Sequence, residues 1–293
     1  MEQEQGFIDY IEQSIIKNWD RNALTDYKGI TLQYKDVARK IAKFHIVLES
    51  AGIRPGDKIA VCGRNSAHWA VAFLATVTYG AVIVPILHEF KADNIHNIVN
   101  HSEAKLLFVG DRAWENLNEE AMPLLMGIVL LTDFTPVVCR NEQLMEAFEH
   151  RNVLYGTRFP KNFRPEHISY RKEESPEELA VINYTSGTTG IFQRGHAPLS
   201  QPLVQMLHIA MRCSPLRPGR PYCIHAASWD MYLVWCTIFY TVFRRRPSVF
   251  PYPYAVSQDY CTVILRNKAT GHFVCTAYRR KDYQEGYPAP DRQ

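Results

Sequence analysis

A short loop rich in glycine, serine and threonine is the part of the chain best suited to chemistry. The six residues TSGTTG, Thr185 to Gly190, follow the apolar segment LAVINY, Leu179 to Tyr184. Glycines let the backbone curl until successive N–H groups converge, and the hydroxyls add donors without bulk, so the loop suits a polyphosphate. An ordinary flexible turn has the same composition, and the residues alone leave both interpretations open.

The loop departs from the common nucleotide-binding pattern, because no G-K-[ST] follows at the required distance. Metal chemistry has little support elsewhere. The seven cysteines include no C-x-x-C pair, and the neighbours Cys223 and His225 have no partner at zinc spacing. We therefore expect free thiols and no protein-held metal cluster.

The loop and the text before it resemble the adenylate-forming enzymes, and long-chain fatty-acid–CoA ligases in particular. Tyr184 to Gly190 match the family signature Y-T-S-G-T-T-G without a gap. Three earlier blocks are also similar to that family: GITLQYKDVARKIA from Gly29, AGIRPGDKIAVCGRNSAHWAVAFLAT from Ala51, and YGAVIVPI from Tyr79. The resemblance covers roughly the first two thirds of the chain and implies part of the large N-terminal domain of that fold.

The resemblance also implies a reaction. In that family the loop holds the phosphates of ATP with Mg²⁺ while a fatty-acid carboxylate attacks the α-phosphate, and the acyl group then passes to the thiol of CoA. Such chemistry depends on positioning and on charge placed at the transition state. Carried over by position, the phosphate contacts are Thr185, Ser186, Gly187, Thr188, Thr189 and Gly190.

Beyond Gly190 the family pattern is lost. Gln193-Arg194-Gly195 stands where the family has lysine before glycine, and no later Y-G-x-T-E, T-G-D or P-x-G-K block follows. The catalytic residues are therefore unknown, and we expect an inactive fragment. Two alternatives stay open: a noncatalytic protein that binds a nucleotide or an acyl group, and a basic C-terminal module for an anionic partner.

A change of reading frame after Gly190 accounts for the missing text. Suitable codons for Ile191–Ser200, read one base later, give YSKGVMLPY, which completes the family loop with its lysine. The same shift of one base, applied to suitable codons from Ser248 onward, gives a sequence rich in helix-forming residues. We therefore predict two parts: 1–190, a partial AMP-binding domain, and 191–293, an out-of-frame segment. A sequence without selected periodicity is not expected to fold natively.

The charge distribution changes at the same place. Up to Gly190 the chain has 20 basic and 25 acidic residues, and after it 13 basic and 5 acidic. The later arginines are not arranged as in any recognisable nucleic-acid-binding module, so we expect no nucleic-acid partner.

The elements that must position the loop follow a regular α/β pattern. Apolar residues from Tyr34 to Ala51 recur at helical spacing, and Gly52 stands where a left-handed cap ends a helix. Later segments predict alternating buried strands and helices: strands at 58–63, 81–86, 105–110 and 128–131, and helices from Ser66 and over 92–101. Alternation of this kind indicates a parallel or mixed sheet with flanking helices.

Two apolar stretches could be mistaken for membrane spans. Trp69–Leu87 carries no charge, but Gly80 and Pro85 divide it, so a buried helix followed by a buried strand is expected. Met231–Phe243 is shorter than a span requires. With no secretory signal at the N-terminus, we expect a cytoplasmic protein without a transmembrane segment. The resemblance to fatty-acid–CoA ligases implies a role in fatty-acid and lipid metabolism.

Overall fold

The computed structural model describes residues 6–26, 29–172 and 178–186, together with five later strands. The helices and strands of the first part are α1 Phe7–Lys17, β1 Asn22–Asp26, β2 Thr31–Gln33, α2 Tyr34–Ser50, β3 Lys58–Cys62, α3 Ala67–Tyr79, β4 Val82–Ile86, α4 Ala92–Ser102, β5 Leu106–Val109, α5 Asp111–Trp114, β6 Gly127–Leu130, β7 Pro136–Cys139, α6 Glu142–Glu149, α7 Arg151–Arg158 and β8 Leu179–Ser186. Short 3-10 turns occupy Glu119–Ala121 and Pro165–His167. The later strands are β9 Phe192–Pro198, β10 Tyr222–Cys223, β11 Ser248–Phe250, β12 Tyr260–Arg266 and β13 Phe273–Arg279.

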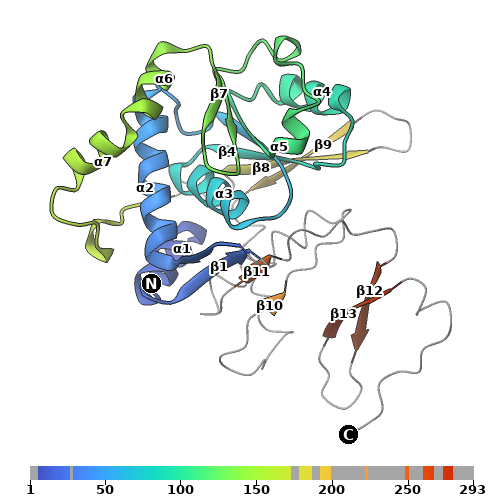
Figure 1. Cartoon of the computed structure of the whole chain (residues 1–293), viewed down its shortest axis with the longest axis horizontal. Helices are drawn as coiled ribbons and strands as arrows, with labels where there is room; N and C mark the ends of the chain where they lie inside the picture. Colours follow the sequence, from blue (N-terminus) through green and yellow to red (C-terminus); the bar gives the residue numbers. More distant parts are fainter. Residues whose placement is uncertain are drawn as a thin grey trace, which may run out of the picture.

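The main sheet has seven strands in the order β7-β6-β5-β3-β4-β8-β9. Strands β6, β5, β3, β4 and β8 run parallel to their neighbours in that order, whereas β7 and β9 at the two edges run antiparallel. The predicted α/β class is confirmed, and the sheet is mixed. Figure 1 shows α2 and α4 on opposite sides of these strands.

Alternate residues of the central strands pack into two hydrophobic clusters, one on each face of the sheet. Ile59 and Val61 of β3 pack with α2 and α3, while Ala60 and Cys62 pack with α4. Because both faces are covered, the five residues of β4 are all buried. Such strands read as continuous apolar runs, which is why AVIVPI could be recognised as one.

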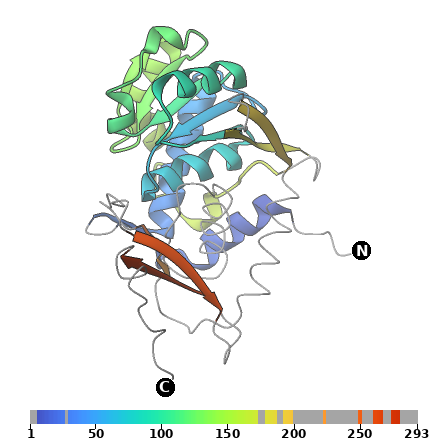
Figure 2. The same cartoon turned by 90° about the vertical axis from the view of Figure 1, so that its right-hand side faces the viewer.

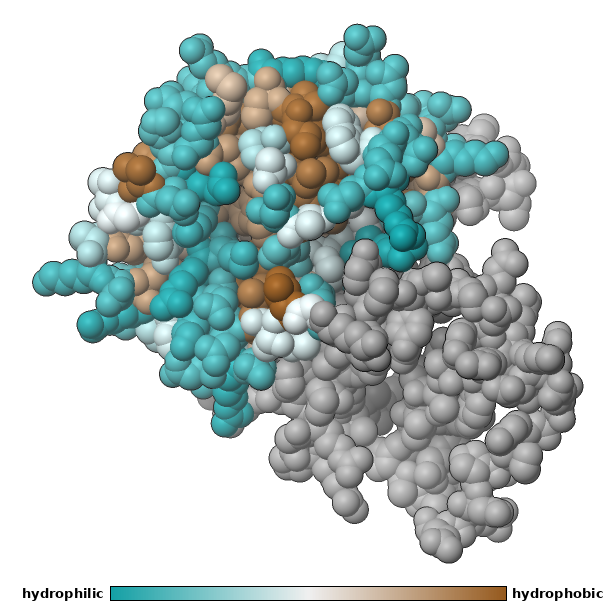
Figure 3. All heavy atoms as spheres, viewed as in Figure 1, coloured by the Kyte–Doolittle hydropathy of each residue, from teal (hydrophilic) through white to brown (hydrophobic). Residues whose placement is uncertain are grey.

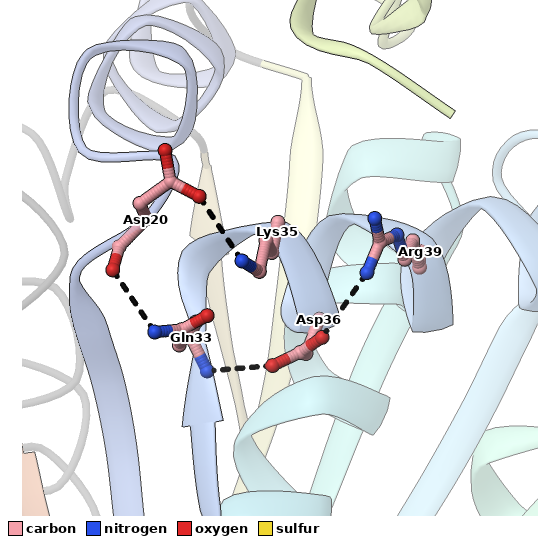
Figure 4. Close-up of polar contacts among 5 residues, drawn as sticks. All are labelled: Asp20, Gln33, Lys35, Asp36 and Arg39. Carbon is pink, nitrogen blue, oxygen red and sulfur yellow. Dashed lines mark hydrogen bonds and ion pairs between the residues drawn. The ribbon is translucent and has the colours of Figure 1, made fainter. Parts of the chain in front are cut away.

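The first predicted helix matches the structure closely. Helix α2 spans Tyr34–Ser50, and Gly52 takes the left-handed conformation with φ +73°. At the other end the Gln33 N–H donates to Oδ2 of Asp36 at 3.0 Å (Figure 4). The helix therefore begins and ends where its capping residues allow.

Helix α3 is held at both ends by specific groups. Oγ of Ser66 accepts a hydrogen bond from the Trp69 N–H at 3.1 Å, and Oδ1 of Asp26 accepts from the Ala67 N–H at 2.8 Å. Burial raises the pKa of Asp26. Gly80 ends the helix with φ +86°, and a Cβ there would lie 2.6 Å from Cδ of Arg171. Trp69–Leu87 is thus the predicted buried helix and strand.

No helix in the described part of the chain is long and apolar enough to cross a membrane. The other stretch considered, 231–243, lies outside the described residues, and so does most of the predicted segment 191–293. A second sheet has the order β10-β11-β1-β2, and β12 pairs with β13.

Candidate functional site

Strands β8 and β9 form the two sides of the candidate phosphate loop. Their antiparallel pairing extends from Leu179 opposite Pro198 to Ser186 opposite Phe192. Thr185 and Ser186 are the last two residues of β8, and Gly187, Thr188, Thr189 and Gly190 lie outside the described residues. Figure 2 shows the two strands, in olive, at one edge of the sheet.

The direction of β8 brings its carboxyl end to a favourable edge of the sheet. Strand β8 is parallel to β4, which is parallel to β3, so the carboxyl end of β8 lies at the same edge as theirs. In open α/β sheets, ligands bind outside the carboxyl ends of the strands. The segment that follows Ser186 therefore begins where a ligand site is expected.

The core fixes β8 from both faces of the sheet. Val181 belongs to the cluster with α2 and α3, whereas Ile182 and Tyr184 belong to the cluster with α4. Val181 and Ile182 are both 0% exposed. A strand held this firmly gives the loop a rigid starting point, which is what a binding site needs.

A histidine from α4 contacts the residue directly before the loop. Nδ1 of His101 is 2.8 Å from the Tyr184 hydroxyl, and the two rings meet edge to face with centroids 5.7 Å apart. Sequence reasoning missed His101, because 83 residues separate it from Tyr184 and no local pattern links them. This contact fixes the end of the strand that leads into the candidate site.

The start of β8 is also attached to the rest of the domain. Arg171 forms an ion pair with Glu178, the residue before the strand, and the Arg171 N–H donates to the Thr78 carbonyl at 3.2 Å. The attachment connects β8 to the end of α3, so the strand is held at its start as well as near its end.

The described residues hold no group of three or more His, Cys, Asp or Glu side chains that could bind a metal ion. Burial raises the pKa of the Cys62 thiol to about 12, so this cysteine stays protonated at neutral pH and is unsuited to nucleophilic chemistry. Cys223 lies in β10, and His225 is outside the described residues.

Comparison with solved structures supports the fold. The chain superposes on the anthranilate CoA ligase AuaEII in complex with anthranoyl-AMP with a TM-score of 0.67 and 16% identity, covering 84% of this chain and 43% of that one. The VinN structure with L-aspartate gives a TM-score of 0.65 at 19% identity, with 84% and 57% covered. At these identities the similarity shows the fold alone.

Sequence relatives are acyl-activating enzymes. Long chain acyl-CoA synthetase 3 of Arabidopsis thaliana is 29% identical over 164 residues, which are 56% of this chain and 24% of that protein. Long-chain-fatty-acid–CoA ligase 5 of Rattus norvegicus is 26% identical over 172 residues, again 56% and 24%. The probable acyl-activating enzyme 16, chloroplastic, of Arabidopsis thaliana is 28% identical over 247 residues, 79% and 33%. The chain thus spans about a quarter to a third of the length of these relatives.

The match to the family as a whole is longer than each of these three alignments. A sequence model described as AMP-binding enzyme matches residues 11–274, which include β8, the TSGTTG loop and the strands on both sides of it. The chain therefore belongs to the AMP-binding enzyme family.

Proposed function

We propose that the chain carries the phosphate-binding part of an AMP-forming acyl-CoA ligase that acts on long-chain fatty acids. The observation that supports this proposal is that TSGTTG begins with the last two residues of β8, whose carboxyl end lies at the same edge of the sheet as that of β4, inside the region that matches the family. Thr185, Ser186, Gly187, Thr188, Thr189 and Gly190 are the proposed phosphate contacts.

The proposed reaction has two steps. The fatty-acid carboxylate attacks the α-phosphate of ATP and pyrophosphate leaves; the CoA thiol then attacks the acyl carbonyl and AMP leaves. Mg²⁺ would offset the charge of the phosphates, and the loop's N–H and hydroxyl groups would hold them. ATP, a fatty acid and CoA are the proposed partners, with no role for nucleic acid.

For this chain we propose nucleotide binding without turnover. The sequence has no Y-G-x-T-E, T-G-D or P-x-G-K block, and residues 191–293 are proposed to be read from a displaced frame. The family match continues past Gly190 to residue 274, so a chain read in one frame throughout is the alternative that the gene must exclude. A noncatalytic protein that binds a nucleotide or an acyl group fits the same observations.

A cytoplasmic location is also a proposal. It is supported by the free thiols of Cys62 and Cys139, which fit a reducing compartment.

The test of the proposed function is ATP binding to the full chain by equilibrium dialysis, with the paired substitution Thr188→Ala and Thr189→Ala. We expect saturable binding that this pair weakens by about tenfold or more, because two hydroxyl donors are lost. Thr157→Ala, on the exposed side of α7, is the matched control and should leave binding unchanged. Equal ATP affinity in all three chains would refute the proposed site.

A further inference from the structure

A groove of about 490 Å³ lies between α2, α6, α7 and the turn that joins β6 to β7. Three cations and three aromatic rings in its lining matter here: Lys40, Lys43, Arg151, Phe44, Phe134 and Phe148. Strands β6 and β7 are at the opposite edge of the sheet from β8 and β9. Figure 3 shows a mainly hydrophilic surface on the side of α2 and α7. The volume is within the usual range for small-molecule sites.

The three cations form no ion pair with a carboxylate of the described residues. Nζ of Lys43 donates to Oδ1 of Asn152 at 2.8 Å, and Nη1 of Arg151 donates to the Phe148 carbonyl at 2.8 Å. Nζ of Lys40 lies 5.5 Å from the centre of the Phe134 ring. These direct contacts are with neutral groups and leave donors for an anion. The carboxylate of Asp36 also acts on Lys40 through its charge, without an ion pair.

The two acids of the groove have polar partners other than Lys40, Lys43 and Arg151, and the partner of Asp36, Arg39, also lines the groove. Asp36 contacts Nη1 of Arg39 at 3.4 Å and accepts the capping hydrogen bond from Gln33, as Figure 4 shows. Oδ1 of Asp133 accepts from the Thr135 N–H at 2.9 Å. Four cations, counting Arg39, thus face two carboxylates, and the groove has an excess of positive charge.

Burial first, and repulsion between the cations second, lowers the pKa of both lysines, while the charge of Asp36 acts in the opposite direction on Lys40. Burial and, after it, the charge of Lys43 lower the pKa of Lys40. Burial and then the charge of Arg151 lower the pKa of Lys43. A bound anion would relieve this repulsion, and a groove lined by one sign of charge concentrates such ligands.

The floor of the groove is aromatic. The rings of Phe44 and Phe134 meet edge to face with centroids 4.6 Å apart, and they are 6% and 7% exposed. Phe134 has φ +61°, a conformation that costs free energy in a residue with a bulky side chain. The turn that presents this ring beside Lys40 is therefore held in place against a local preference.

We propose that this groove binds a small organic anion, an aryl phosphate in chemical class, with the phosphate on Lys40, Lys43 and Arg151 and the ring against Phe44 and Phe134. The phosphate would take the donors that the three cations leave open, and the flat body would lie against the small part of the Phe44 and Phe134 rings that reaches the surface. The site is separate from the phosphate loop and does not depend on the proposed ligase function.

The experiment is equilibrium dialysis of the full chain with 1-naphthyl phosphate, a fluorescent probe of this class. We expect saturable binding that Lys40→Gln, Lys43→Gln and Arg151→Gln each weaken by about fivefold or more, because each removes a charged donor. Lys40→Arg, which keeps the charge, should stay within about threefold of the unchanged chain. Arg158→Gln, on the same helix as Arg151 but outside the groove, is the matched control.

Two further comparisons define the ligand and the location. Inorganic phosphate and 1-naphthol, each half of the probe, should bind at least about tenfold more weakly than the whole. The Thr188→Ala, Thr189→Ala chain should bind the probe normally. Circular dichroism spectra identify any variant that fails to fold. The proposal is overturned if the three glutamine variants fold and bind normally, if 1-naphthol binds equally well, or if the unchanged chain shows no binding.

Discussion

The described parts of the chain before and after Gly190 are built differently. Before it, strands alternate with helices, and alternate residues of each central strand enter the two clusters on the two faces of the sheet. After it, the described residues occur in strands only. Parallel neighbours need a crossover connection, usually a helix, and the first part supplies helices between its parallel strands. The candidate loop joins the two parts, because β8 belongs to the first and β9 to the second.

This contrast shows what supports the candidate site. Strand β8 has core contacts from both faces, an ion pair at its start and the His101 contact near its end. In its pairing with β4, Val181 of β8 lies opposite Ile83. The pairing of β8 with β9 extends along the whole strand. The side of the loop contributed by the first part is therefore secured by packing.

The largest effect is expected from placing one charge in each part. Val84→Asp puts a carboxylate at a position that is 0% exposed in β4, and should lower the free energy of unfolding by more than about 4 kcal/mol. The matched change Val263→Asp in β12 should alter it by less than about 0.5 kcal/mol if the later part is not natively folded. Urea denaturation measures both, and a large loss from Val263→Asp would show a cooperative core there.

A pH effect should come from His45, which lies in the first part. Nε2 of His45 is 3.1 Å from the Ala75 carbonyl and from Oγ1 of Thr78, and burial lowers the pKa of His45 from 6.5 to about 4. The unfolded chain takes up a proton below pH 6.5 and the folded chain only near pH 4, so stability is lost as the pH falls between them. Between pH 6.5 and pH 4 the free energy of unfolding should fall by about 1.4 kcal/mol per pH unit, which amounts to about 3 kcal/mol in all.

Urea denaturation at several pH values checks this slope against His45→Gln. The variant should be less stable at neutral pH but should lose about 3 kcal/mol less on acidification. Parallel pH profiles for the two chains would exclude His45 as the source.

A smaller effect is expected at the junction with the loop. Tyr184→Phe removes the hydroxyl that meets His101 and should cost about 1 kcal/mol, with a loss of ATP affinity of a few fold. His101→Phe should cost a similar amount, and the double variant should cost little more than either, because the two changes remove one interaction. Fully additive losses would show that the contact contributes nothing.

The smallest effect is expected on the surface of the first part. Glu49 and Arg158 form an ion pair at 2.6 Å between α2 and α7, but their side chains are 62% and 52% exposed. Glu49→Gln should therefore change the free energy of unfolding by less than about 0.5 kcal/mol in urea denaturation. A loss above about 1 kcal/mol would mean that the pair does more than surface pairs usually do.

The sequence predicts those elements best that carry their own local signals. The spacing of apolar residues and the position of Gly52 predict the bounds of α2 to within one residue. For α3, the predicted start at Ser66 is the observed N-cap. Helix α1 was missed, although Phe7, Ile8, Ile11 and Ile15 recur at helical spacing and are all buried. That signal is local and could have been used.

The rest depends on contacts between distant segments. Strand order, the antiparallel edges and the His101–Tyr184 contact are set by long-range packing, which no window of sequence contains. The cationic groove is another example, because Lys40 and Arg151 belong to different helices and meet only in the fold. For the loop itself, Thr185 and Ser186 belong to β8, which extends two residues beyond the expected end of the strand at Tyr184, and the roles of all six residues remain predictions.

The nucleotide sequence of the gene across the codons for Thr188 to Leu265 tests the difference between the two parts most directly. The account predicts that the frame one base along encodes YSKGVMLPY, or a close variant with its lysine, directly after Gly190, and ligase-like text again from the codon of Ser248. Codons that give no such text in either neighbouring frame would contradict it, and residues 191–293 would then have to be explained as an in-frame continuation of the family domain.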